Sequence, residues 1–172
     1  MMSRAVPFIS LITAIGFWTA AAVPAWAEEG NPAALAAAMK NATATLQAGL
    51  KASEAQGTPI SAKFEIEDGK LQLSVYTIKG NDFMEVVADP TTGVIAKADK
   101  ITDAGDLKEA TAQKAAMAKA KVPLLTATET AVKANAGSRA VSIVPELKSG
   151  QATAEVTLLA GNTFKKVTEK LD

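Results

Sequence analysis

Polar and apolar residues alternate in two stretches of the chain, Thr58–Ile95 and Ser138–Leu171. A period of two indicates strands that bury one face. In the first stretch Asp68-Gly69 is a strong hairpin signal, and Gly80-Asn81 marks a second turn. Asp89–Gly93 supplies a third turn, because proline fixes one backbone dihedral and glycine accepts a positive one. The pattern predicts an antiparallel meander of three or four strands.

Helical spacing dominates the segment before this meander. Apolar residues recur there at intervals of three or four, which places them on one side of a helix. They are Leu35, Met39, Ala42, Leu46 and Leu50. Asn31-Pro32 is a suitable helix start, and Gly57 followed by Pro59 is a suitable end. The sequence therefore predicts one helix over about 32 to 56.

Two further helices are expected between the two alternating stretches. Asp106 can cap a helix over about 107 to 121, which Pro123 ends. Thr126 with Glu129 matches a capping box at the start of a helix over about 127 to 136. The second meander would then follow this helix, as the first meander follows the first helix.

The two alternating stretches align without a gap at one constant offset, which matches Gly69 with Gly150. Gly80-Asn81-x-Phe83-x-x-Val86 recurs as Gly161-Asn162-x-Phe164-x-x-Val167. Small meanders can match by chance at turns and apolar positions, but a shared motif at one offset favours duplication. We expect an α+β fold of two repeats, each a helix packed on a three-stranded antiparallel meander. A lone meander buries little apolar surface, so the repeats are expected to share a core or an extended sheet.

The start of the chain, 1–27, has the features of a secretory signal. Arg4 precedes an apolar run, and Ala25-Trp26-Ala27 is a small-x-small cleavage site. An uncleaved membrane anchor is the alternative interpretation. With cleavage, the chain divides into a signal (1–27), a first repeat (28–100) and a second repeat (101–172). The expected location is periplasmic or secreted, without stable membrane insertion after cleavage.

Composition narrows the chemistry. The chain has 18 basic and 18 acidic residues and contains neither histidine nor cysteine. It therefore cannot form a Ser-His-Asp triad, a Cys-His pair or a zinc site with His or Cys ligands. Its balanced charge gives no electrostatic attraction to nucleic acid. We expect a protein that is not an enzyme, needs no cofactor and binds no nucleic acid.

At the third turn the residues resemble a known family. Val86-x-x-Asp89-x-x-Thr92-Gly93 is similar to the most recognisable turn of PepSY domains, and Leu125-Thr126-x-x-Glu129 is similar to their usual helix start. The resemblance covers most of the chain after the signal as two tandem copies, although the second copy lacks this turn. PepSY domains occur in propeptides of secreted metallopeptidases and in bacterial envelope proteins. The resemblance implies a module that binds a protein or extended peptide and modulates a peptidase.

Carboxylates are the candidate metal ligands. The candidates are Glu65, Glu67, Asp68, Asp82 and Asp89, with Glu85 in the same acidic group. Oxygen ligands suit a hard cation, so a cation-binding or small-ligand protein is the alternative function. Interspersed lysines favour a solvated charged face instead. For Asp89, acceptance of the backbone N–H groups of its own turn is the stronger interpretation.

Three other features carry alternatives. Exposed edge strands can pair with an extended peptide, or lysines and Pro145 can protect them from such pairing. Tyr76 and Phe83 can anchor a partner or pack in the core, and core packing is the stronger interpretation. Ser61 and Lys63 are the residue types of a Ser-Lys hydrolase, but only their presence supports that activity.

Overall fold

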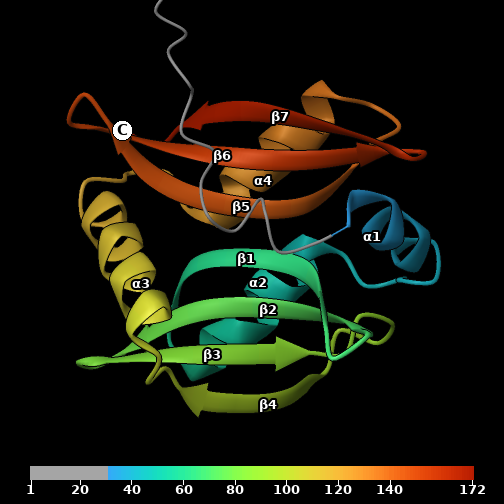
Figure 1. Ribbon diagram of the computed structural model, residues 1–172. Coiled ribbons are helices and arrows are strands. Elements are labelled where there is room, and N and C mark those ends of the chain that lie inside the picture. Colours follow the sequence, from blue (N-terminus) through green and yellow to red (C-terminus); the bar gives the residue numbers. More distant parts are fainter. Residues whose placement is uncertain (1–30) are drawn as a thin grey trace, which may run out of the picture.

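The computed structural model describes residues 31–172, so the predicted signal at 1–27 lies outside the described residues. The elements are α1 (Pro32–Met39), α2 (Leu46–Ser53), the 3₁₀ helix η2 (Glu54–Gln56), β1 (Thr58–Glu67), β2 (Lys70–Lys79), β3 (Asp82–Ala88), β4 (Ile95–Lys100), α3 (Ala104–Met117), α4 (Leu124–Ala134), β5 (Arg139–Lys148), β6 (Gln151–Ala160) and β7 (Thr163–Lys170). The strands form one seven-stranded antiparallel sheet in the order β4-β3-β2-β1-β5-β6-β7 (Figure 1). The predicted α+β class is confirmed.

The two meanders join through antiparallel pairing of β1 with β5. Ala62 lies opposite Ile143, and Lys63 lies opposite Ser142. The expected extended sheet is therefore present, and the halves are not two separate units. The first meander has four strands, since β4 pairs with β3, and two helices precede each meander. The prediction of one helix on three strands was therefore wrong in the helices of both halves and in the strands of the first half, while the second half has the expected three strands.

The constant offset seen in the sequence also relates the strands of the two halves. β5 spans the positions equivalent to those of β1, and β6 spans the positions equivalent to those of β2. The register irregularity between Pro59 and Ser61 recurs between Ala140 and Ser142. Both hairpins turn through two residues of positive φ, at 50° and 75° for Asp68-Gly69 and at 51° and 81° in the second half. This is the backbone of a type I′ turn, which matches the twist of the adjoining strands.

The larger core lies between one face of the sheet and the helices α2 and α4, which lie behind the sheet in Figure 1. Cross-strand neighbours such as Ala62, Val75 and Val86 share this face and are almost fully buried. Gly49 lets α2 approach closely, because a β-carbon there would collide with the side chain of Leu73. Apolar burial on this side supplies the main stabilisation of the sheet.

Helix α3 crosses the opposite face at one end of the sheet (Figure 1). A second, smaller core forms there from Ile60, Tyr76, Ile101 and Ala110. The Ser61 hydroxyl donates a hydrogen bond of 2.8 Å to Gln113 Oε1 on α3. Tyr76 is 7% exposed, so it is a core residue and not an exposed anchor.

The predicted helix over 32 to 56 is interrupted, and this is the main error of the sequence prediction. Asn31 caps α1 as expected, but α1 ends at Met39 and Thr45 caps a separate helix α2. Arg139 stabilises the interruption, because its guanidinium donates to the carbonyls of Met39, Ala42 and Ala44 at 2.6 to 3.1 Å. A tertiary contact from β5 thus outweighs a continuous helical pattern.

The starts of the other two helices were also misplaced. Asp103, not Asp106, caps α3 by accepting the N–H groups of Gly105 and Asp106. Helix α4 begins at Leu124, directly after Pro123, and Thr126 lies inside it. Burial of Leu124, which is 3% exposed, favours the earlier start over the predicted capping box.

Candidate functional site

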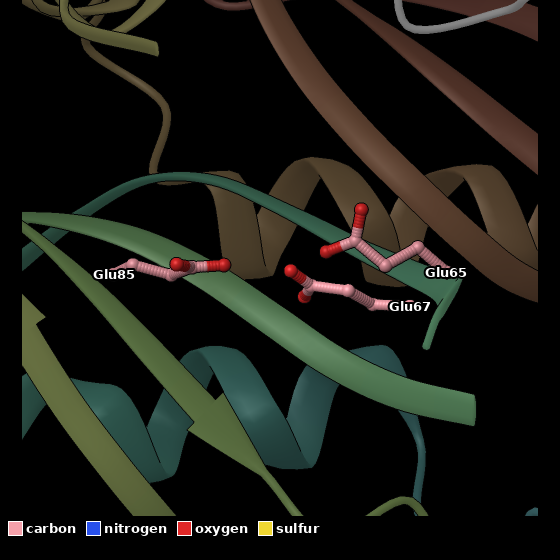
Figure 2. A group of neighbouring side chains, drawn as sticks. All are labelled: Glu65, Glu67 and Glu85. Carbon is pink, nitrogen blue, oxygen red and sulfur yellow. The ribbon is translucent and has the colours of Figure 1, made fainter. Parts of the chain in front are cut away.

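Polar residues gather on the sheet face that α2 and α4 leave uncovered. Glu65 and Glu67 project from β1 on this face, and Glu85 projects from β3 (Figure 2). One carboxylate oxygen from each of the three lies within 4.8 Å of the other two. Such a group of oxygen atoms can hold a hard cation if the carboxylates are free to turn toward it.

Two of the three carboxylates, Glu65 and Glu67, already have partners. Lys63 Nζ lies 2.6 Å from Glu65 Oε2. Gln72 Nε2 donates to Glu65 Oε1 at 3.3 Å and also to Glu67 Oε2. A cation at this cluster would have to displace the Lys63 ammonium group or the Gln72 amide. In this arrangement the cluster is a set of cross-strand polar contacts.

Charge crowding changes the acid-base properties of this face. Burial raises the pKa of Glu85, and the nearby charges of Glu65 and Glu67 raise it further. Burial alone would lower the pKa of Lys63, but the charge and hydrogen bond of Glu65 outweigh it, so the net pKa is raised. The proton of Lys63 is therefore held strongly, and Glu85 ionises less readily than an ordinary glutamate.

The structure separates the other three predicted ligands from this cluster. Asp68 lies in the β1–β2 turn, and Asp82 pairs with Lys100 of β4 at 2.6 Å. The Asp89 carboxylate accepts the N–H groups of Thr91 and Thr92 at 3.0 and 2.7 Å. These bonds and the Thr92 hydroxyl lower the pKa of Asp89. The turn-stabilising interpretation of Asp89 is the one that its contacts fit.

The Ser-Lys pair is not arranged for nucleophilic catalysis. Ser61 is buried under α3, with 7% of its surface exposed, and its hydroxyl donates to Gln113. Lys63 holds its ammonium against Glu65. A nucleophile needs a base that accepts its proton, and neither residue offers the other that contact.

The second candidate feature is the pair of sheet edges. Within residues 31–172, no strand pairs with the outer edge of β4 or with that of β7. β4 has six residues and a register shift against β3 at Val87/Ala88. β7 has eight residues and pairs with β6 in one uninterrupted register. Sequence reasoning noted free edges, but it did not distinguish these two.

A cleft of about 530 Å³ lies where the start of β1 and the end of β2 meet the start of α4. Leu50, Ile78 and Leu124 are among the apolar residues that line it, and Glu54 and Lys79 stand at its walls. Glu54 is paired with Lys51 at 2.7 Å. Apart from Glu54, Lys79 and Thr58, the residues that line the cleft are apolar or glycine, and this lining indicates no ligand class.

Comparison with known proteins assigns no family. No family model matches the chain, and no curated protein matches it. Among solved structures, a crystal structure of a “putative lipoprotein” from Clostridium difficile 630 is similar over 70% of this chain and 88% of that chain. The two are 14% identical with a TM-score of 0.34, which is too distant to support an argument about function. None of the helices in residues 31–172 has the length and apolar character needed to cross a membrane.

The raised pKa of Glu85 predicts how stability depends on pH. The folded state holds this proton more tightly than the unfolded chain does. Stability is therefore lost as pH rises from the ordinary value of 4.5 through the raised folded value. Glu85→Gln removes this loss. We expect the variant to be more stable than the native protein at neutral pH by about 0.5 to 1 kcal/mol, with the difference shrinking below about pH 4.5.

Urea unfolding over a series of pH values measures this difference. Glu129→Gln, which changes an exposed carboxylate on α4, is the matched control and should show no comparable gain. Equal stability of Glu85→Gln and the native protein at every pH would contradict the proposed crowding around Glu85.

Proposed function

We propose that this protein is a non-enzymatic binding module that takes up an extended segment of another protein at a sheet edge. The observation that supports it best is the open sheet, whose outermost strands β4 and β7 have no further partner among residues 31–172. An unpaired edge presents N–H and C=O groups in the spacing that an extended chain can complement. Main-chain pairing would provide affinity, and side chains on either face would provide selectivity.

The contacts around the polar side chains support a binding role over catalysis. Ser61 and Lys63 have structural partners, and the carboxylates of the polar face are bridged by Gln72 and Lys63. The chain also lacks histidine and cysteine. Because these polar side chains hold strands and turns together, the backbone of the sheet edges is the surface that is left for recognition.

The resemblance to PepSY domains extends this proposal to location and partner class. With cleavage after Ala27, the module would act in the periplasm or outside the cell. Its partner would be another exported protein, and a peptidase whose activity the module modulates is the partner class that the resemblance suggests. Neither the fold nor the edges depend on this extension.

Selection from a displayed library of random peptides of about ten residues tests the binding role. We expect enrichment of peptides with strand-forming residues and without internal proline, because proline removes a donor from the ladder. Enriched peptides should lose affinity when alternate amides are N-methylated, while their scrambled sequences keep some binding. A library that yields no binder above background would contradict the proposed function.

The carboxylate cluster supports a second candidate, binding of a hard cation by Glu65, Glu67 and Glu85. One oxygen of each is close enough to share an ion, but Lys63 and Gln72 already occupy two of the three groups. Calorimetric titration with calcium and with a trivalent lanthanide separates the candidates. We expect no saturable heat at millimolar ion, whereas binding that Glu67→Gln abolishes would favour the cation function.

A further inference from the structure

We propose that the outer edge of β7 is the docking edge and that it pairs antiparallel with an acidic extended segment of a partner protein. This inference rests on the proposed function and adds the site, the direction and the charge of the ligand. It comes from comparing β7 with its equivalent in the first half, β3, whose outer edge is covered by β4 (Figure 1).

In the first half, β4 occupies the edge of β3 that corresponds to the outer edge of β7. The starts of β3 and β7 are equivalent positions in the two halves, so Phe164 is the equivalent of Phe83. The Phe83 carbonyl accepts the N–H of Ile101 at 2.9 Å, at the end of β4. Five residue pairs then join β3 to β4 in antiparallel register. The same edge of β7 carries no strand among residues 31–172.

The alternation of an antiparallel ladder identifies the backbone groups on this edge. The N–H of Leu171 donates to the Ala152 carbonyl at 2.9 Å, toward β6. In an antiparallel strand, residues an even number of positions apart point their hydrogen-bonding groups the same way. The backbone N–H and C=O groups of the intervening residues therefore point away from β6, toward the outer edge. These residues are Phe164, Lys166 and Thr168. Phe164 has the same orientation as Phe83, whose carbonyl faces β4.

The segment proposed to pair with β7 should differ from β4 in its charge. In the first half an acidic strand meets a basic one, and Lys100 of β4 pairs with Asp82 of β3 at 2.6 Å. In β7 the equivalents of Asp82 and Glu85 are Thr163 and Lys166. β7 also carries Lys165 and Lys170, against one acid, Glu169. Lys166 is paired with Glu155 of β6, so Lys165 and Lys170 supply the basic surplus, and complementary charge favours an acidic segment on β7.

Lysines on an edge strand often block further pairing, but the side chains of two β7 lysines bend back and contact the protein itself. Lys165 Nζ donates to Asn135 Oδ1 at 2.7 Å, at the end of α4. Lys166 Nζ lies 2.7 Å from Glu155 of β6. Both ammonium groups thus reach inward from β7. β4 differs, because it is shorter and its ladder with β3 is irregular, a feature that blunts edges.

A synthetic peptide of alternating glutamate and valine, about eight residues long with blocked ends, is the probe. Its affinity for the full chain is measured by fluorescence anisotropy at low salt. Thr168→Pro removes one outward N–H of β7 without removing a bond to β6, which an edge strand tolerates. Ala98→Pro removes an outward N–H of β4 in the same way and is the matched control.

We expect the native protein and Ala98→Pro to bind the probe equally and Thr168→Pro to bind it at least about tenfold more weakly. The matched lysine-valine peptide should bind the native protein at least about tenfold more weakly than the acidic probe. This comparison between peptides uses only the native protein, so it remains decisive if Thr168→Pro does not fold.

Four results would overturn the inference. Loss of affinity in Ala98→Pro but not in Thr168→Pro would place the peptide on β4, and equal or tighter binding of the lysine-valine peptide would refute the acidic ligand. A dimer that Thr168→Pro dissociates would assign the edge to a second copy of this chain. If the acidic probe fails to bind while library peptides bind elsewhere, this inference fails and the proposed function stands.

Discussion

The pairing of β1 with β5 is the contact on which the rest of the structure depends. It joins Ala62 to Ile143, which occupy equivalent positions in the two halves, and both are almost completely buried. Each meander alone would leave an inner edge unpaired and too little surface buried. Joining them pairs the two inner edges at their centres and leaves β4 and β7 as the two ends of one sheet. The same contact brings Arg139 of β5 to the carbonyls between α1 and α2.

Local signals in the sequence predicted the features that local chemistry determines. The turns at Asp68-Gly69 and Asp89–Gly93 form as expected, because positive φ and carboxylate acceptance are decided within a few residues. The interrupted first helix was missed, since its cause is Arg139, which lies in the other half of the chain. The sequence pattern could not decide how the two meanders join, for a related reason. Period-two alternation defines the two faces of a strand, but it does not select which strand edges pair.

The candidate site was predicted in part. Alternation placed Glu65 and Glu67 on one face, and the structure brings Glu85 beside them through the register of β2 with β1 and β3. It also supplies Gln72 as the bridging donor, which no local pattern indicates. The same registers hold Tyr76 under α3. What emerges is a sheet whose faces carry its own helices and paired side chains, and this is the basis for proposing recognition at the outer edges.

Amide hydrogen exchange along β7, followed residue by residue by NMR, tests this account most directly. In the free protein the amides of Phe164 and Thr168 should exchange rapidly, while those of Lys165 and Val167 are protected by β6. Addition of the acidic probe should slow exchange at Phe164 and Thr168 and abolish the alternation. Alternation that persists in the presence of saturating probe, or protection of Phe164 and Thr168 already in the free protein, would contradict the claim that β7 is the docking edge.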